Sequence, residues 1–268
     1  MARHWKIRER KFSLSRPLIM GILNVTPDSF SDGGRFPSPG DAALAALEMV
    51  ADGADIIDIG GESTRPGATE IDEQTELARV LPAVRALRRV TDAPISIDTR
   101  HASVARAALE EGADIVNDVS ALADPAMAEA VRVFHAGIVL MHGYGGESAD
   151  GVRDFLRERI DFAAGAGIDS ETIVVDPGIG FSKTTDENIA VLKALPELAA
   201  LGVPVLVGLS RKRFIGEITH VAEPAERVSG SVAAMLWTIW HGASIVRVHD
   251  VRATREAIDI ATAIASGS

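Results

Sequence analysis

The chain has 268 residues, of which 47% are hydrophobic and 24% charged, so it can bury a large core and is not a disordered protein. Its formal net charge of −11 excludes a general nucleic-acid binder, because a phosphate backbone requires a basic surface. It contains no cysteine, which excludes disulfides, thiolate catalysis and cysteine-ligated metal sites and fits a reducing compartment.

The apolar segments of the chain are short. None near the N-terminus is long enough for a signal peptide, and the longest, residues 232–240, falls short of the roughly 20 residues that a membrane span needs. We therefore expect a cytoplasmic protein without membrane contact.

Short apolar runs recur along the chain, and each ends in polar residues. Continuous apolar runs of this length are typical of parallel strands that are buried on both faces. The runs cover residues 18–23, 56–59, 95–97, 115–116, 138–141, 173–175, 203–207 and 245–248. They predict eight parallel strands.

Between these runs the apolar residues have helical spacing. We expect helices over 41–51, 73–90, 101–111, 125–134, 151–165, 186–194, 229–241 and 252–265. Asp41 is the candidate N-cap of the first helix. Five glycines stand where a helix should stop before the next strand, namely Gly112, Gly137, Gly167, Gly202 and Gly242.

This alternation predicts one domain, residues 1–268, built as a (β/α)8 TIM barrel over about 18–265, with roughly 33 residues per strand–helix unit. The weak alternation of Trp5, Ile7, Phe12 and Leu14 predicts a β-hairpin over about 3–17 that closes the barrel floor. A doubly wound open sheet is the alternative, but no Gly-x-Gly-x-x-Gly turn follows the first strand.

The carboxyl ends of the strands and the loops after them build the active site of such a barrel. The candidate residues are therefore Asn24, Asp28, Thr64, Arg65, Asp98, Asn117, Asp176, Lys212, Arg247 and His249. Taken alone, Asp98 and Asn117 are better explained as helix caps. Asp176 differs because Pro177 and Gly178 follow it in a tight path. Carboxylates and an amide at three strand ends would suit a flat heterocycle with several N–H donors.

Arg247 and His249 share one face of the last strand. Buried cations need an anionic partner, which is either a ligand or, with equal weight, a neighbouring carboxylate. Barrels often hold phosphate near strands seven and eight, so these residues and 210–212 suggest a phosphorylated ligand. His142 is more easily explained as a satisfied histidine than as a zinc ligand, and the Trp237/Trp240 pair as packing or a subunit interface.

Several of these segments resemble dihydropteroate synthases, the folate-pathway enzymes that sulfonamides inhibit. The resemblance lies in residues 21–34 (GILNVTPDSFSDGG), 60–67 (GGESTRPG), 96–99 (SIDT), 117–118 (ND), 176–181 (DPGIGF), 210–212 (SRK) and 247–250 (RVHD). No single segment is diagnostic, but together they span about residues 17–252 in the right order.

The resemblance implies a transferase that condenses a dihydropterin methylene pyrophosphate with p-aminobenzoate and releases pyrophosphate, with Mg²⁺ as cofactor. It also implies a homodimer formed through the late helices. For the pterin it implies Asp98, Asn117, Asp176, Lys212 and Arg247. For p-aminobenzoate it implies Phe30, Thr64, Arg65, Pro66 and Phe181. For the pyrophosphate it implies Asn24, Arg65, Arg247 and His249, with Asn24 also holding Mg²⁺. The implied catalytic residues are Asp28, Asp98, Lys212, Arg247 and His249.

The chemistry of this reaction agrees with these residue types. Pyrophosphate leaves readily once its charge is neutralised, and a cation-like (SN1-like) transition state would be favoured by nearby carboxylates such as Asp98 and Asp28. An aromatic amine is already neutral near pH 7, so no activated nucleophile is needed. Positioning and electrostatics, with closure of loops 25–39 and 61–71, then suffice.

The sequence differs from the family pattern at two places, and two other functions compete with this interpretation. The loop at 143–150 lacks the Gln, Arg and Pro residues common in the family, and Arg213 stands where some members have Ser. A folate-binding methyltransferase barrel would share the pterin-binding Asp and Asn but would not need the loop at 63–66. A degenerate paralogue would bind pterins without catalysis, yet every charged position that the chemistry needs is filled.

Overall fold

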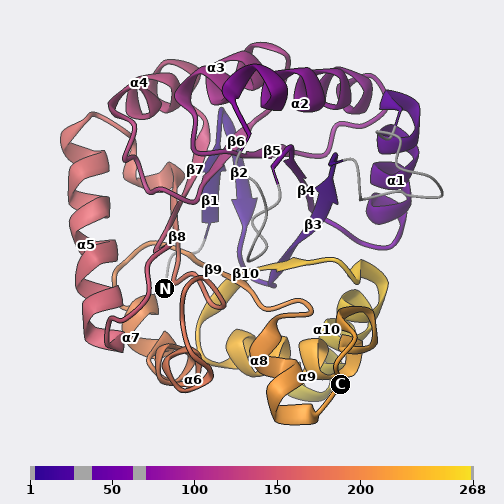
Figure 1. Ribbon diagram of the computed structural model, residues 1–268, viewed down its shortest axis with the longest axis vertical. Coiled ribbons are helices and arrows are strands. Elements are labelled where there is room, and N and C mark those ends of the chain that lie inside the picture. Colours follow the sequence, from indigo (N-terminus) through magenta and orange to yellow (C-terminus); the bar gives the residue numbers. More distant parts are fainter. Residues whose placement is uncertain (1–3, 27–37, 63–70, 267–268) are drawn as a thin grey trace.

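The computed structural model describes residues 4–26, 38–62 and 71–266. Eight parallel strands form a closed barrel in which β10 pairs with β3, and the remaining strands follow in chain order (Figure 1). The strands are β3 (Leu18–Asn24), β4 (Ile56–Gly60), β5 (Ile95–Asp98), β6 (Ile115–Asp118), β7 (Gly137–Met141), β8 (Ile173–Asp176), β9 (Val205–Gly208) and β10 (Ala243–Val248). The predicted TIM barrel is confirmed.

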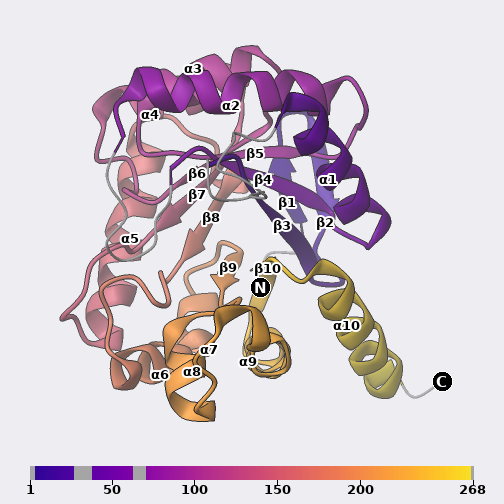
Figure 2. The same cartoon turned by 45° about the vertical axis from the view of Figure 1, so that its right-hand side comes forward.

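Helices surround the barrel, as Figure 1 shows, and α10 extends away from its body (Figure 2). They are α1 (Pro39–Ala51), α2 (Glu73–Arg88), α3 (Ala102–Glu110), α4 (Pro125–Phe134), α5 (Ala149–Gly165), α6 (Thr185–Lys193), α7 (Leu195–Ala199), α8 (Arg213–Thr219), α9 (Val228–Trp240) and α10 (Val251–Ser266), with short 3₁₀ turns at η1 (Ser170–Thr172) and η2 (Pro224–Glu226). No helix in the described part of the chain is long and apolar enough to cross a membrane.

Three local predictions need correction. The N-cap of α1 is Ser38, and Asp41 occupies position N3 of the capping box, where its carboxylate accepts the backbone N–H of Ser38. The helices α7 and α8 were missed, because five and seven residues are too few to show a helical period.

The third correction concerns Gly137, which does not end a helix. His135 takes the left-handed conformation there, with a φ of 51°, and Gly137 is the first residue of β7. The other four predicted stops do have positive φ angles. Gly137 is small for a different reason: a Cβ atom would lie 3.0 Å from Cζ2 of Trp5.

Alternate residues of the strands serve two separate cores. Outward-facing residues such as Ile57 and Val246 pack against the helices in the larger core. Inward-facing residues near the start of the strands form a second core inside the barrel: Leu18, Met20, Ile56, Ile115, Val139, Val174, Leu206 and Ile245. We call this second core the floor.

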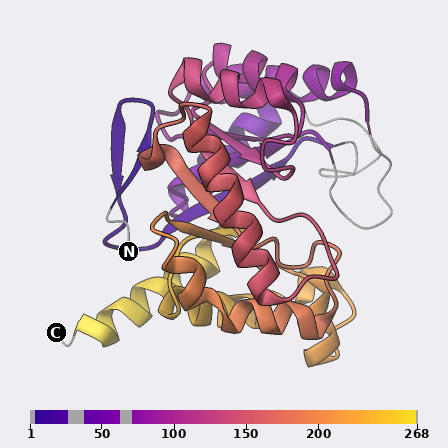
Figure 3. The ribbon, with the colours of Figure 1, turned by 90° about the vertical axis from the view of Figure 1, so that its left-hand side faces the viewer.

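The N-terminal hairpin closes this floor, as predicted. β1 (His4–Ile7) pairs antiparallel with β2 (Arg10–Ser13), and Figure 3 shows the hairpin at one end of the barrel. Trp5 and Ile7 are buried in the floor core, and the indole Nε1 of Trp5 donates to the carbonyl of Thr172 at 2.8 Å. Ligands must therefore enter from the opposite end.

Two residues beyond the floor on β4, β6, β8 and β10, the inward-facing positions become polar. On β4 and β5, Asp58 pairs in register with Ser96, and Gly60 pairs with Asp98. On β6, Asn117 pairs with Asp98. Because residues two apart share a face, these side chains and those of Asp176 and Arg247 stand above the floor. We call this polar end of the barrel interior the mouth.

Candidate active site

Arg247 lies at the centre of a buried charge cluster in the mouth. Its Nε donates to Oδ2 of Asp58 at 2.6 Å, and its Nη2 donates to Oδ2 of Asp98 at 2.7 Å. Burial disfavours the cation, but the two carboxylates outweigh it and hold the pKa of Arg247 above its ordinary value. The ion pair that the sequence left as one of two explanations is present.

Asp58 is a residue that the sequence reasoning missed. Its side chain is completely buried, and Oδ2 also accepts the amide Nδ2 of Asn117 at 3.2 Å. Its Oδ1 and the hydroxyl of Ser96 are buried and make no hydrogen bond within the described part of the chain. A signal existed: an aspartate inside the apolar run Ile56–Ile59 must meet a cationic or donor partner.

Asp98 and Asp176 are carboxylates whose ionisation is shifted. Burial, with a contribution from Asp58, raises the pKa of Asp98 to about 7 against the pull of Arg247. Burial raises the pKa of Asp176 to about 6, although its Oδ1 accepts the backbone N–H of Gly178 at 2.8 Å. Both groups therefore change charge near neutral pH.

Helix capping does not explain Asp98 or Asn117. The N-cap of α3 is His101, and that of α4 is Asp124, whose side chain accepts the N–H of Ala126. Asp98 and Asn117 lie inside the barrel, where they reach Arg247 and Asp58 instead. The capping interpretation was wrong for both residues.

Lys212 approaches the same cluster from the loop after β9. Burial and the charge of Arg247 lower its pKa to about 8, while Asp176 and Asp98 favour its cation. Its Nζ lies 4.2 Å from the ring centroid of Phe181. Gly180, with a φ of 81°, gives the lysine stem its path, because a Cβ there would lie 2.7 Å from Cδ of Lys212. The structure thus brings Lys212 and Phe181 together.

His249 follows β10 and is oriented by Ser210. Its Nδ1 lies 3.0 Å from the Ser210 hydroxyl, which also accepts the His249 backbone N–H at 3.2 Å. Arg211, by contrast, forms a two-pronged pair with Asp250, at 2.6 and 3.1 Å. Within residues 210–212, Ser210 and Lys212 thus serve the mouth, and Arg211 holds the loop.

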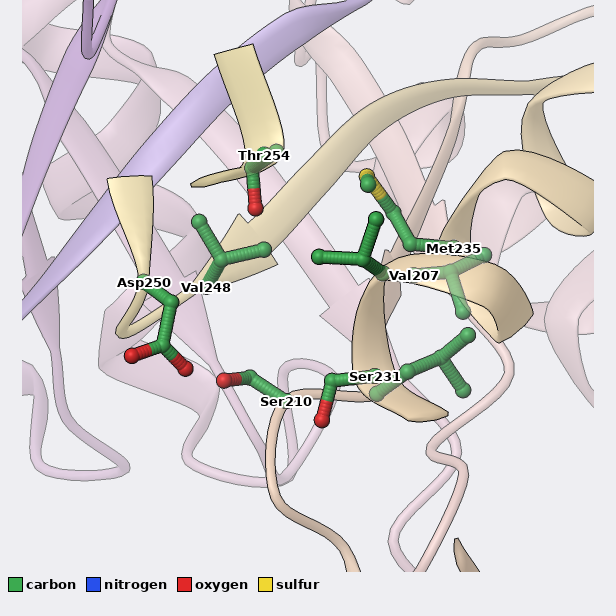
Figure 4. Close-up of a pocket in the computed structure, with 9 residues that line it drawn as sticks. Val207, Ser210, Ser231, Met235, Val248, Asp250 and Thr254 are labelled. Atoms are coloured by element: carbon green, nitrogen blue, oxygen red, sulfur yellow. The ribbon is translucent and has the colours of Figure 1, made fainter. Parts of the chain in front are cut away.

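A small cavity lies behind this corner rather than in the mouth. Figure 4 shows Ser210, Ser231, Asp250 and Thr254 around it together with apolar side chains of β9, β10 and α9. Its volume of about 10 Å³ is of the order of a single water position. It is too small for any organic substrate.

Asn24 ends β3 beside Gly60, its partner in the register. A Cβ at Gly60 would lie 3.4 Å from Oδ1 of Asn24 and 3.9 Å from Oδ2 of Asp98. The glycine therefore lets these two polar groups approach each other at the rim. The remaining predicted residues, Asp28, Phe30, Thr64, Arg65 and Pro66, lie outside the described residues.

His142 and Lys183 form a second polar cluster next to the mouth. His142 is fully buried, and its Nε2 lies 3.1 Å from Oε2 of Glu147. Its Nδ1 lies 3.0 Å from Nζ of Lys183, a residue that the sequence reasoning also missed. Burial lowers the pKa of Lys183 to about 8. His142 is thus a satisfied histidine, as expected.

The fold and the site define a barrel enzyme with a sealed apolar floor and a buried, charge-balanced pocket at the carboxyl ends of its strands. The model of the family described as "Pterin binding enzyme" matches residues 20–249. The chain belongs to this family.

Within the family, the chain is similar to dihydropteroate synthases. It is 48% identical to that of Synechocystis sp. over 93% of this chain and 90% of the relative. The structure of the Xanthomonas albilineans enzyme with 4-aminobenzoic acid matches with a TM-score of 0.94 and 46% identity, covering 99% of both chains. The same enzyme with 7,8-dihydropteroate matches at 0.91 and 44%, covering 98% of both. The Yersinia pestis enzyme with a sulfonamide drug matches at 0.91 and 41%, covering 98% of this chain and 99% of that one.

Proposed function

We propose that this protein catalyses the dihydropteroate synthase reaction of folate biosynthesis. In this reaction 6-hydroxymethyl-7,8-dihydropterin pyrophosphate condenses with p-aminobenzoate to give 7,8-dihydropteroate and pyrophosphate. The observation that carries the proposal is the cluster of Asp98, Asn117, Asp176 and Lys212 around Arg247. It occurs in a chain that aligns with dihydropteroate synthases over almost their whole length.

The mouth offers the groups that a pterin ring needs. One N–H of the Asn117 amide donates to Asp58, which fixes the amide orientation, and we expect the Oδ1 of Asn117 to accept a hydrogen bond from the ligand. Ionised Asp98 and Asp176 accept ring and amino N–H groups, and protonated Lys212 donates to a ring acceptor. The planar guanidinium of Arg247 provides a stacking surface.

The second part of the proposed site is the p-aminobenzoate pocket. We assign it to Phe30, Thr64, Arg65, Pro66 and Phe181. The support in the described residues is Phe181, whose ring lies beside the ammonium of Lys212 at 4.2 Å and so faces the pterin cluster. We therefore expect p-aminobenzoate to bind on the Phe181 side of Lys212.

For the pyrophosphate we propose Asn24, Arg65, Arg247 and His249, with Asn24 also holding Mg²⁺. Among the described residues no group of three or more His, Asp or Glu could hold a metal ion. A single amide oxygen still fits Mg²⁺, which commonly takes one or two protein ligands and completes its shell with substrate phosphates and water. When bound, the ion neutralises charge on the leaving group.

The residues of the mouth then act by position and charge. The bond between the pterin methylene carbon and the pyrophosphate oxygen breaks, and its electron pair leaves with the pyrophosphate. The lone pair of the aromatic amine forms the new C–N bond, and the amine afterwards loses one proton. Ionised Asp98, and Asp28 in our assignment, favour the positive charge that develops on the methylene. No nucleophile of the protein takes part.

The test is pyrophosphate release by the purified protein with the pterin pyrophosphate and Mg²⁺, with and without p-aminobenzoate. We expect release that depends on p-aminobenzoate, with one dihydropteroate formed per pyrophosphate. Tight pterin binding without product would contradict the proposal and indicate a degenerate binder. Methyl transfer to a corrinoid would indicate the methyltransferase alternative.

Sulfonamides provide a further prediction about this site. The chain continues from Phe181 through Ser182 to Lys183 without an insertion, so the pocket wall should keep the usual shape of the family. We expect a sulfonamide to inhibit in competition with p-aminobenzoate at concentrations that stop a sensitive relative. Full activity at those concentrations would refute this prediction.

We also propose that the protein is a cytoplasmic homodimer. The absence of cysteine supports the compartment. The dimer is supported by α9, where Trp240 is 66% exposed while Trp237 stacks on His241 at 3.7 Å. We expect sedimentation equilibrium to give twice the chain mass of 28.3 kDa, and Trp240→Glu to shift it toward the monomer.

A further inference from the structure

We propose that Lys183 is a positioning residue: its ammonium clamps the loop after β7 to the loop after β8 and thereby sets the p-aminobenzoate pocket at Phe181. The part of this inference that concerns p-aminobenzoate rests on the proposed function. The clamp itself rests on contacts of the described residues alone.

The first support is the set of acceptors around Lys183. Its side chain is buried, and its Nζ donates to the carbonyls of His142 at 3.2 Å and Tyr144 at 2.9 Å, which belong to the first loop. On the second loop it donates to the carbonyls of Gly178 at 3.0 Å and Phe181 at 3.5 Å. An ammonium has three N–H donors, so it bonds both loops at once.

The second support is the tautomer of His142. Its Nδ1 lies 3.0 Å from Nζ of Lys183 and must accept, because the ammonium has only donors. The ring proton then stands on Nε2 and is donated to Glu147 at 3.1 Å. The ring also packs edge-on against Phe155 of α5, with centroids 4.9 Å apart. Lys183 is thus tied to an immobilised imidazole.

The third support is the close approach of the two backbones. A Cβ at Gly178 would lie 1.9 Å from the carbonyl oxygen of His142, and a Cβ at Gly145 would lie 1.7 Å from that of Ser182. No side chain fits between the loops at these points. Two glycines and one ammonium therefore hold the loops in direct contact.

The fourth support is the left-handed backbone path that carries Phe181. Gly178 and Gly180 have φ angles of 67° and 81°, and Ser182, a residue with a side chain, has 49°. The two glycines adopt these angles freely, but the conformation of Ser182 persists only where neighbouring contacts determine it. Phe181 stands between two of these residues, and its ring faces Lys212 at 4.2 Å. Loosening Lys183 should therefore move Phe181.

Asp176 should respond differently. It belongs to β8, where it pairs with Met141, and its carbonyl accepts the backbone N–H of His142 at 2.9 Å. The barrel ladder thus holds Asp176 without Lys183. This difference predicts a split: losing the clamp should weaken p-aminobenzoate binding more than pterin binding.

The main experiment compares Lys183→Met with Lys193→Met, a control lysine that is exposed on α6. We expect Lys183→Met to raise the KM for p-aminobenzoate about 10-fold or more, with the KM for the pterin pyrophosphate changed less than about 3-fold. Amide exchange should accelerate in residues 142–147 and 178–183 but not in the hairpin. Both KM values rising equally, or neither rising, would overturn the proposal.

Two further measurements keep the test decisive if Lys183→Met folds poorly. Because the chain has no cysteine, Lys183→Cys can be alkylated in urea with 2-bromoethylamine and refolded, which restores an ammonium at that position alone. We expect this product to recover the wild-type KM and exchange rates, and a 2-bromoethanol product not to. Gly145→Ala, which forces the loops apart without touching Lys183, should reproduce the raised KM. Failure of both would refute the clamp.

The exchange measurement needs no substrate. If the wild-type protein released no pyrophosphate but Lys183→Met still loosened the two loops, the proposed function would fail and the clamp would stand. If the wild-type protein were active but Lys183→Met left amide exchange in the two loops unchanged, the proposed function would stand and the clamp would fail.

Discussion

At the floor of the barrel, Ile56 on β4 and Ile245 on β10 are completely buried beneath Trp5. Two residues further along the same strands, Asp58 and Arg247 form a buried ion pair at 2.6 Å. Burying the isoleucines stabilises the fold by roughly 1.5 to 3 kcal/mol each. Burying the charges instead carries a desolvation cost, which shows in the raised pKa of Asp98. The apolar floor thus stabilises the fold, and this stability allows the fold to hold the buried charges of the mouth.

The largest expected effect tests the floor. Trp5→Ala removes a fully buried indole and its hydrogen bond to Thr172, so we expect a loss of about 3 to 5 kcal/mol in unfolding free energy. Urea titration measures this loss. KM values at low temperature should stay near wild type, because the mouth is built from other layers.

Trp5→Phe is the matched control for the floor. It keeps an aromatic ring and loses the indole N–H, so its loss should be clearly smaller than that of the alanine variant. If Trp5→Ala instead changed the KM values and left stability intact, the division between floor and mouth would be wrong.

The next largest effect tests the mouth. Asp98→Asn should lower turnover about 100-fold or more, because it removes a carboxylate that favours the cationic methylene. Pyrophosphate release with p-aminobenzoate is the measurement. Asp161→Asn, at an exposed position of α5, is the control and should be silent. Turnover within a few-fold of wild type would rule out the role that we give Asp98.

The same variant should not lose stability at pH 8. The folded pKa of Asp98, about 7, lies above the unfolded value of about 3.9, so its stabilising contribution is present below pH 4 and is lost as the pH rises to about 7. Above that pH the buried carboxylate is a net cost, and Arg247 keeps Asp58 as a partner. We expect equal or greater stability in urea for Asp98→Asn.

A smaller effect sharpens the picture of the floor. Gly137→Ala would place a Cβ 3.0 Å from Trp5 and 3.2 Å from Ile115, so we expect a loss of about 1 to 3 kcal/mol from overpacking. Combining it with Trp5→Phe should give less than the sum, because the two changes share one contact. Strict additivity in urea titrations would argue against that contact.

The smallest effect is the pH dependence of the mouth. Asp98 and Asp176, with pKa values of about 7 and 6, must be ionised, and Lys212, at about 8, must be protonated. The value of kcat/KM for the pterin pyrophosphate should therefore peak near pH 7.5 and fall about threefold at pH 6.5 and about twofold at pH 8.5. A flat profile over this range would show that these groups do not act as assigned.

Most of the barrel could be predicted from the sequence because its parallel strands are continuous apolar runs. The polar residue after a run then marked the mouth, which is how the sequence predicted Asp98, Asn117 and Asp176. Arg247 lies inside the last run and was predicted instead from the strand face that it shares with His249. The helices α7 and α8 were missed because they are too short to show a period. Gly137 was misread because its need for space depends on Trp5, a residue far away in the chain.

The two site residues that were not predicted, Asp58 and Lys183, were missed for a different reason. Asp58 lies inside a strand and Lys183 inside a loop, so neither occupies the strand-end position that guided the search. Their roles depend on partners that only the closed barrel supplies, Arg247 for Asp58 and the carbonyls of two loops for Lys183. A charged residue in an apolar run is nevertheless a usable signal, and it would have identified Asp58.

The hairpin that seals the floor has a consequence for how the chain is made. Trp5 bonds a carbonyl 167 positions later in the sequence, at Thr172, and His4 reaches Glu171 over the same separation. At ribosomal rates of about 5 to 20 residues per second, the hairpin waits roughly 8 to 33 s for these partners to be synthesised. During that interval the indole of Trp5 lacks its binding site. The indole is fully buried only after β10, the last strand of the floor, has also been synthesised, so the nascent chain exposes this hydrophobic side chain through most of its synthesis.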